Sequence, residues 1–325
     1  MTKAALLSTC CDPFTTSLCL KFWKERWYSE VDHFYINLNN HCKVPPEVIG
    51  EFMQYWANEP KITFIYHSTG KGNGPPQVEL LKICETDLIL LLEEDFFIFE
   101  SGVVDGYFKK IESGEADILG SPRYTYGEVA DAAKKMYNLD YSGIGDRGFG
   151  YWPTGFYCKK SDLLKTDLDF GSKEYKAGAY YKELDHTFTE TSYTDTFTWA
   201  SLQLRYLGLK SIEIPQYHAS PFEIEEYEKK ELKWAEKPGY IHGGSLSAGW
   251  GGYLQNSTPD TNDNSSMQEI ETRCAFWQIA SETTEGFDSF KKDYQDGIIR
   301  LIERANLDNS RIEIKKKIYR DLMKI

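Results

Sequence analysis

The stretch DLILLLEED, residues 87–95, decides the fold because five apolar residues run without a break into three acids. A continuous apolar run of this length is typical of a strand buried on both faces, as in a parallel sheet covered by helices. Side chains alternate along a strand, so Glu93 and Asp95 share one face and Glu94 points away. Three adjacent acids repel one another, and burying them requires a positive partner. From this pattern alone, a site for a hard divalent cation and a solvated strand end both remain open.

The residues before this stretch alternate between strand patterns and helix patterns. Strands are expected over 3–11, 31–39, 61–68 and 87–95, and helices over 12–30, 45–59 and around 77–84. Pro13 and the Pro45-Pro46 pair suit the first positions of their helices. Strands that alternate with helices at this spacing predict βαβ units and a parallel sheet. Such a sheet binds ligands at the carboxyl ends of its strands, where the three acids lie.

The pattern becomes mixed beyond residue 100. We expect a helix over 105–113, a strand over 116–123, irregular chain or short helices over 124–150, a strand, glycine turn, strand and helix over 151–165, and a strand over 210–215. A short amphipathic helix is expected over 194–208, ended by Gly208. Its apolar face should contain Phe197, Ala200, Leu204 and Leu207.

The chain becomes polar after residue 222, which suggests a boundary. We expect one domain over 1–222, with a nucleotide-binding half over 1–100 and an acceptor-side half over 101–222, and an extension over 223–325. The extension should contain a Gly-rich loop over 239–254, a linker over 255–266 and three helices over 267–325.

Composition restricts the partners of this chain. A net charge of −13 over 325 residues argues against sequence-independent nucleic-acid binding, which needs a basic surface. Seven scattered cysteines follow no metal-finger or disulfide spacing, so they are expected to be reduced thiols. No apolar run approaches the ~20 residues of a membrane span, and the amino terminus has no signal-peptide pattern. We therefore expect a cytoplasmic protein, with contact to a membrane surface left open by the basic, amphipathic segment 310–325.

Three further features have a functional and a structural interpretation. Asp195 precedes a predicted helix, where it serves either as an ordinary cap or as a general base. His218 follows the predicted strand 210–215 and is either a metal ligand or a packed histidine. The loop TGKGNG, residues 69–74, is either a flexible turn or a phosphate site approached by backbone amides and Lys71. It fits neither a Walker A motif nor a dinucleotide fingerprint.

The order of these features resembles the GT-A glycosyltransferases, especially the large family 2-like group. Glu93-Glu94-Asp95 matches the DxD-type motif that ends the fourth strand in that group. The segment TDTFTWASLQLRYLGLKSIEIP, residues 194–215, matches a later pattern whose second acid is the catalytic base. The first acid of that pattern is replaced by Thr194. The resemblance spans roughly residues 3–220 and is one of order, not of identity. The family usually has an arginine in the helix before the fourth strand, and this sequence has none there. Pro76 and Gln77 lie near that position.

The resemblance implies a GT-A fold, in which a mainly parallel central sheet is flanked by helices, with a helical extension at the carboxyl terminus. It implies a metal-dependent transferase that moves a sugar from a UDP- or GDP-sugar to a hydroxyl of a glycan or glycoconjugate, with inversion. Asp95 would bind Mn²⁺ or Mg²⁺, and His218 would be a further ligand. The nucleotide-sugar would contact residues at the ends of the first, second and fourth strands and the Gly-rich loop: Thr9, Asp12, Asn37, Asn39, Lys71, Glu93 and Glu94.

On the acceptor side, the resemblance implies that Asp195 is the general base. Sugar-binding residues are expected in the turn after residue 151 and in the Gly-rich segment: Trp152, Thr154, Gly155, His242 and Trp250. The segment 239–254 is either a substrate lid or a structural loop. Two other functions stay open: a sugar-phosphate nucleotidyltransferase, which should have a basic Gly-rich loop after its first strand, and a non-catalytic carbohydrate- or nucleotide-binding protein. The sequence STCCDPFTTS, residues 8–17, lacks such a loop.

Overall fold

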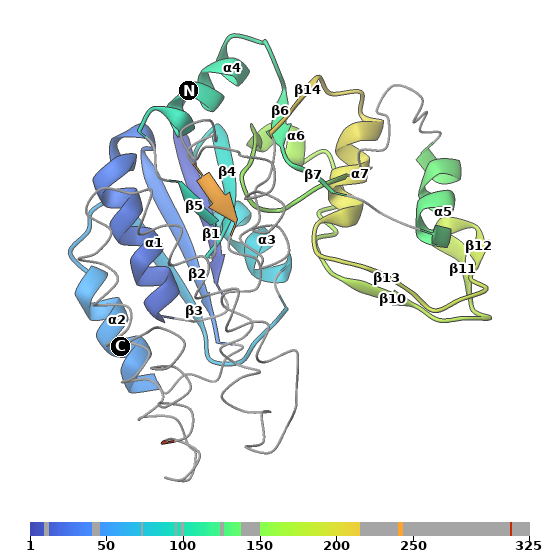
Figure 1. Cartoon of the computed structure of the whole chain (residues 1–325), viewed down its shortest axis with the longest axis horizontal. Helices are drawn as coiled ribbons and strands as arrows, with labels where there is room; N and C mark the ends of the chain where they lie inside the picture. Colours follow the sequence, from blue (N-terminus) through green and yellow to red (C-terminus); the bar gives the residue numbers. More distant parts are fainter. Residues whose placement is uncertain are drawn as a thin grey trace, which may run out of the picture.

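The computed structural model describes residues 1–9, 13–40, 46–72, 74–94, 96–98, 101–123, 127–137, 150–214, 240–242 and 313. Within these ranges, seven strands form one central sheet in the order β14–β6–β9–β4–β1–β2–β3. They are β1 (Lys3–Thr9), β2 (His33–Asn39), β3 (Ile62–His67), β4 (Leu88–Glu93), β6 (Ile118–Gly120), β9 (Phe156–Lys159) and β14 (Ser211–Glu213). Every neighbouring pair is parallel except those of β9, which runs antiparallel between β4 and β6. The predicted α/β class with a mainly parallel sheet is confirmed (Figure 1).

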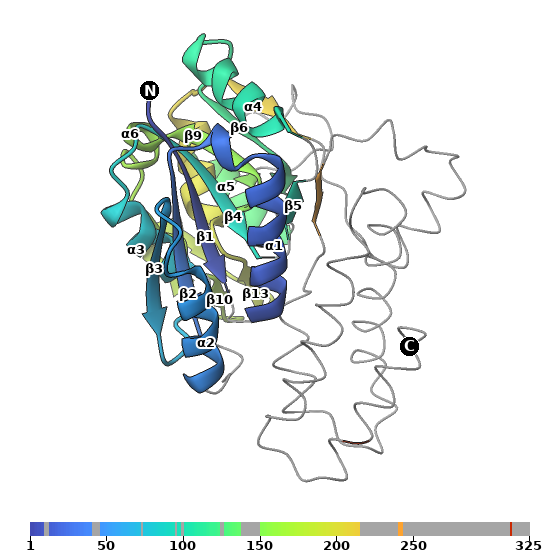
Figure 2. The same cartoon turned by 90° about the vertical axis from the view of Figure 1, so that its left-hand side faces the viewer.

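Helices cover both faces of this sheet, as the resemblance to GT-A glycosyltransferases implies. On one face, Trp23 of α1 (Pro13–Arg26) stacks on Phe34 of β2 with ring centres 5.6 Å apart. On the other face, Tyr35 belongs to the same buried cluster as Leu80 of α3 (Gly74–Ile83). Phe34 and Tyr35 are adjacent in β2, so their opposite directions follow from the alternation of a strand. Figure 2 shows α1 and α3 on the two sides of the sheet.

Other helices extend these layers. They are α2 (Pro46–Trp56), α4 (Val103–Glu112), α6 (Lys160–Leu163) and a short 3₁₀ turn over Tyr28–Glu30. In the part of the chain that the structure describes, no helix has the length and apolar character needed to cross a membrane.

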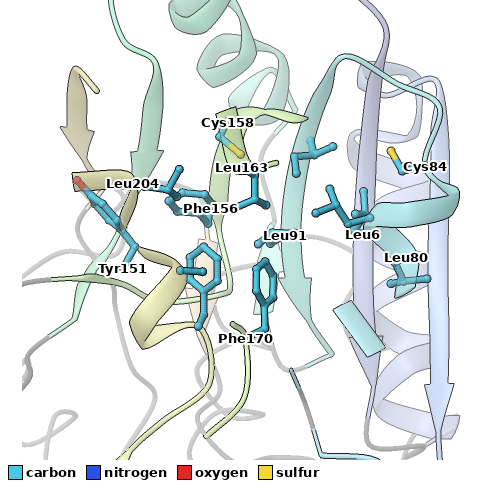
Figure 3. Close-up of a cluster of buried hydrophobic side chains, with 14 of the residues drawn as sticks. Leu6, Leu80, Cys84, Leu91, Tyr151, Phe156, Cys158, Leu163, Phe170 and Leu204 are labelled. Carbon is cyan, nitrogen blue, oxygen red and sulfur yellow. The ribbon is translucent and has the colours of Figure 1, made fainter. Parts of the chain in front are cut away.

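The main buried cluster lies on the α3 face of the sheet and extends across β9 (Figure 3). Leu6 and Leu91 come from the central strands, and Phe156 comes from β9. Phe170 and Phe197 complete it from the second half of the chain, with their rings 4.8 Å apart. This packing fixes the residues that follow β4 and β6 at one edge of the sheet.

A smaller lobe packs beside the sheet, on the right of Figure 1. It contains α5 (Gly127–Tyr137), α7 (Thr198–Tyr206) and the paired strands β10 (Lys173–Tyr175) with β13 (Ser192–Thr194) and β11 (Tyr180–Tyr181) with β12 (His186–Thr187). Trp199 and Leu202 of α7 pack in the lobe, whereas Ala200 and Leu204 belong to the main cluster. The helix α7 therefore joins the two hydrophobic cores.

Several predicted boundaries are wrong, each for a local reason. The helix predicted over 12–30 ends at Arg26, and the strand predicted to continue to Asp95 ends at Glu93. The helix around 77–84 begins at Gly74, because Pro75 and Pro76 need no backbone N–H donor in the first turn.

The helix predicted over 194–208 begins at Thr198, because Phe197 adopts φ +67° and acts as its N-cap residue. Leu207, predicted on the apolar face, is 41% exposed because it follows the last helical residue. The segment 239–254 is not all loop. Residues 240–242 form β15 (Tyr240–His242), which pairs antiparallel with β5 (Phe96–Ile98). The linker over 255–266 and the three helices over 267–325 lie outside the described residues, apart from Glu313, which is helical.

Candidate active site at the carboxyl edge of the sheet

The order of the strands predicts a ligand site between β1 and β4. The chain forms β1, β2 and β3 in one direction and then returns to the other side of β1 to form β4. Open α/β sheets bind ligands outside the carboxyl ends of their strands at such a reversal. Ser8 and Glu93 are register partners at this edge. The topology and the acidic sequence motif therefore indicate the same place.

The acidic stretch divides between the two faces of the sheet. Glu93 is half-buried, and its backbone N–H donates to the Thr154 hydroxyl at 3.1 Å. Glu94 is buried, and its carboxylate accepts a hydrogen bond from the Thr16 hydroxyl of α1 at 2.8 Å. Its carbonyl accepts another from the Cys19 thiol. The predicted alternation of Glu93 and Glu94 is confirmed. The described contacts of Glu94 bind α1 to the end of β4, and its nucleotide role stays a prediction.

A turn at the start of β9 lies against the end of β4. Because β9 is antiparallel, its first residue, Phe156, is the register partner of Leu91 near the carboxyl end of β4. Thr154 is buried, and Gly155 adopts φ +61°. The predicted turn at these residues is confirmed. This turn therefore packs residues from a distant part of the sequence against the acidic end of β4.

Asp195 lies at the same edge and is paired with an arginine. Arg123 ends β7 (Pro122–Arg123), which pairs with β8 (Gly150–Tyr151) just beyond the carboxyl end of β6. Its guanidinium forms an ion pair with Asp195 and donates to the Thr196 carbonyl at 2.8 Å. It also lies 4.1 Å from the centre of the Trp152 ring. Arg123, which sequence analysis missed, therefore connects Asp195 with the turn beside Glu93.

The geometry around Asp195 excludes the helix-cap interpretation. The helix begins three residues later, and one carboxylate oxygen accepts from the N–H and hydroxyl of Thr196. Partial burial raises the pKa of Asp195, but the charge of Arg123 and the Thr196 hydrogen bonds outweigh it, and the net pKa is below the ordinary value. The side chain remains 59% exposed. Asp195 is thus an ionised carboxylate held in one orientation and open to a substrate.

The two asparagines predicted to contact a nucleotide differ in their contacts. Asn39 accepts from the Lys71 N–H at 2.9 Å and donates to the Gly72 carbonyl at 3.0 Å, which anchors the Gly-rich loop. Asn37 is fully buried, and among the described residues neither its amide nitrogen nor its amide oxygen has a partner. A buried amide without partners is costly, so the Asn37 amide is suited to hydrogen-bond a ligand at this edge. Lys71 pairs with Glu79 at 3.0 Å, and its phosphate role stays a prediction.

Asn37 belongs to a polar row across the sheet. Ser8 is the register partner of both Glu93 and Asn37, so these three residues share one face near the carboxyl edge. Gln77 in the first turn of α3 donates to the Pro153 carbonyl at 3.4 Å, and its buried amide oxygen has no partner in the part of the chain that the structure describes. Gln77 was not among the residues predicted for this site. Thr9 is buried at the end of β1.

The remaining predicted residues are only partly described. Asp12, Asp95, His218 and Trp250 lie outside the described residues. The backbone of His242 is described, and it pairs with Phe96, the residue that follows Asp95. The register therefore places His242 beside the acidic stretch, although it was predicted on the acceptor side.

The donors at this edge suit a hard cation. In the described part of the chain, no group of three or more His, Cys, Asp or Glu side chains is close enough to hold a metal ion. Glu93 and Asp95 would supply carboxylate oxygens, which Mn²⁺ and Mg²⁺ prefer. A metal bound here would also need ligands from the substrate, as is usual for Mg²⁺ sites with phosphates.

The turn beside Glu93 should tolerate no side chain at Gly155. A Cβ there would lie 2.6 Å from the ring of buried Phe96, and the positive φ adds backbone strain. We expect Gly155→Ala to lower the free energy of unfolding by roughly 2–5 kcal/mol, measured by denaturant titration. Gly106→Ala in α4 is the matched control, since its Cβ would meet nothing within 4 Å. Equal stability of the two variants would contradict the described turn.

The ion pair predicts how the pKa of Asp195 responds to Arg123. Arg123→Gln should raise the pKa of Asp195, since the positive charge that favours its ionised form is lost. Because the folded-state pKa is depressed, this pair stabilises the protein above the unfolded-state pKa and loses its effect as pH falls through the folded-state value.

The titration of Asp195 can be followed by carboxyl NMR, with Asp195→Asn to identify its signal. The stability difference between the wild type and Arg123→Gln should narrow on acidification. An unchanged titration in Arg123→Gln would show that Arg123 does not control the charge of Asp195, whereas Arg123→Lys should preserve much of the shift.

Among known proteins, this chain is similar only to solved structures, at low sequence identity and low TM-score. No family model matches the chain, and no curated protein matches it. Among solved structures, S. aureus TarS 1–349 is 10% identical, with a TM-score of 0.41, over 100% of this chain and 90% of that chain. The same fragment in complex with UDP-GlcNAc is 12% identical, with a TM-score of 0.38, over 100% and 91%. HddC from Yersinia pseudotuberculosis is 16% identical, with a TM-score of 0.32, over 51% and 80%. At these identities and TM-scores, the likenesses establish neither a family nor an activity for this chain.

Proposed function

We propose that this chain is a glycosyltransferase that moves a sugar from a nucleotide-sugar to a hydroxyl of a carbohydrate or glycoconjugate. One observation carries the proposal. The acidic end of β4 and the carboxylate of Asp195 share one edge of the sheet, joined by the Glu93–Thr154 hydrogen bond and the Arg123–Asp195 ion pair. A transferase of this kind needs both features, one for the diphosphate and one for the attacking hydroxyl.

The donor would lie across the ends of β1, β2 and β4. The unpartnered amide of Asn37 offers one donor and one acceptor, which can pair with the edge of a nucleobase. The diphosphate would reach the acidic end of β4 at the strand-order reversal. Thr9 and Asp12 would contact the nucleoside from the end of β1. The acidic end of β4 would repel a diphosphate, and a bound divalent cation would offset this local repulsion.

Glu93 and Asp95 would hold Mn²⁺ or Mg²⁺, with His242 or His218 as a further ligand. A bound ion would offset the charge that develops on the leaving diphosphate. Other residues of this chain hold the acidic stretch in position. The Thr154 hydroxyl fixes the backbone of Glu93, and the buried contact of Glu94 with Thr16 keeps the end of β4 against α1.

Asp195 would accept the proton of the acceptor hydroxyl. The hydroxyl oxygen then attacks the anomeric carbon, and the bond from that carbon to the diphosphate breaks with inversion. Arg123 keeps the carboxylate ionised and oriented, so it is available at neutral pH. The depressed pKa makes it a weak base, but positioning is the larger part of general-base catalysis here.

The test is release of nucleotide from a panel of UDP-, GDP-, CDP- and TDP-sugars, with and without Mn²⁺. We expect one class to be turned over, faster with an oligosaccharide acceptor present and slower after chelation. A parallel assay with sugar 1-phosphates and nucleoside triphosphates follows pyrophosphate release. Turnover in that assay alone would favour a nucleotidyltransferase, and turnover in neither would overturn the proposal.

A further inference from the structure

An exposed tyrosine lies two residues before Asp195. Tyr193 belongs to β13, opposite Glu174 of β10, and is 69% exposed. Exposure alternates here, since Tyr193 and Asp195 are exposed whereas Thr194 and Thr196 are buried. Such alternation is typical of extended chain, in which every second residue lies on the same side. Tyr193 and Asp195 therefore lie on one outward side, with α-carbons about 7 Å apart.

The Tyr193 ring is held in place. Its hydroxyl donates to a carboxylate oxygen of Glu174 at 3.0 Å, and this hydrogen bond raises the pKa of Tyr193, so the phenol stays protonated. The second oxygen of Glu174, Oε2, has no partner among the described residues. Glu174 is itself exposed and can accept hydrogen bonds from a ligand.

The strands beneath this pair pack on buried aromatic side chains. Tyr175, next to Glu174, points inward and stacks on Phe188 with ring centres 4.7 Å apart. The Tyr175 ring also contacts the Trp199 ring of α7. Ala200, the next residue of that helix, belongs to the main buried cluster. A binding surface on a packed sheet loses little entropy when a ligand binds.

We propose that Tyr193 and Glu174 form a subsite for an uncharged sugar ring of the acceptor, next to Asp195. The face of an aromatic ring carries partial negative charge and packs against the C–H groups of a pyranose. The Glu174 carboxylate accepts hydrogen bonds from sugar hydroxyls. The Asp195 carboxylate is already paired with Arg123, whereas Glu174 forms no ion pair among the described residues, so the Glu174 charge beside the ring disfavours phosphate and other anions. The role of this sugar as acceptor rests on the proposed function, whereas its binding does not.

The experiment measures binding of the labelled full-length chain to an array of oligosaccharides of neutral hexoses and N-acetylhexosamines. We expect wild-type protein to bind a subset and Tyr193→Ala to bind it about tenfold more weakly. Tyr193→Phe keeps the ring and should retain most binding. Tyr180→Ala is the matched control. Tyr180 lies in β11, which pairs with β12; it is 59% exposed, and its hydroxyl donates to Asp185 at 3.1 Å.

Thermal unfolding with UDP and Mn²⁺ runs beside the array and should give the same shift in all four proteins. Equal glycan binding by Tyr193→Ala and wild type, or no binding by wild type, would overturn the subsite. Glycan binding that depends on Tyr193, in a protein that turns over no nucleotide-sugar, would support the subsite and defeat the proposed function.

Discussion

Asp195→Asn should slow sugar transfer by roughly two to four orders of magnitude, the usual contribution of a positioned general base. Asparagine has nearly the same shape, and its oxygen can still accept from the N–H and hydroxyl of Thr196. It cannot accept the acceptor's proton, however. The charge partner of Arg123 is lost; Asp195 is 59% exposed but the Arg123 side chain is only 10% exposed, so the free energy of unfolding should fall by roughly 1–3 kcal/mol.

The measurement is a transfer assay beside thermal unfolding and nucleotide binding. Asp185→Asn is the matched control, because Asp185 is another exposed carboxylate in an ion pair, with Lys135. Its φ of +45° is one that asparagine also accepts. The control should keep its rate. If Asp195→Asn also transferred at the wild-type rate, Asp195 would not be the base, and the mechanism would stay open, including one with retention.

The sheet and its acidic end could be predicted because hydrophobic periodicity and strand–helix alternation are local signals. The run Leu88–Leu92 is buried in β4, and the alternation that separates Glu93 from Glu94 follows from strand geometry alone. Likewise, the Gly turn before β9 was visible in the sequence as Thr154-Gly155. These features need no information about distant residues.

The remaining parts of the site depend on contacts between distant residues. Arg123 and Asp195 are separated by 72 positions, and the sequence around either residue does not indicate that the two form an ion pair. The antiparallel insertion of β9, which brings Thr154 to Glu93, is likewise a matter of sheet order. One signal was present: Arg123 closes the segment ILGSPR, just after a short apolar strand, where ligands are expected. The helix start was misplaced because Phe197 takes a left-handed conformation that is uncommon for such a residue.

Asp95→Asn should weaken Mn²⁺-dependent binding of a nucleoside diphosphate by roughly 30-fold or more, since a charged partner is removed from the cation. Asp95 lies outside the described residues, between Glu94, which is tied to α1, and Phe96, which is buried beside Gly155. Both neighbours are fixed, so the fold should survive the change. Asp87→Asn is the matched control: Asp87 precedes β4 at its opposite end and accepts from Thr2, so its loss should leave nucleotide binding unchanged.

Calorimetric titration of UDP, GDP, CDP and TDP into the wild type, Asp95→Asn and Asp87→Asn, each with and without Mn²⁺, tests the central claim most directly. The account predicts that one nucleoside diphosphate binds the wild type and Asp87→Asn with Mn²⁺ and much more weakly without it. Asp95→Asn should lose that dependence on Mn²⁺. Absence of binding by all four nucleotides, or an unchanged Mn²⁺-dependent affinity in Asp95→Asn, would contradict the account.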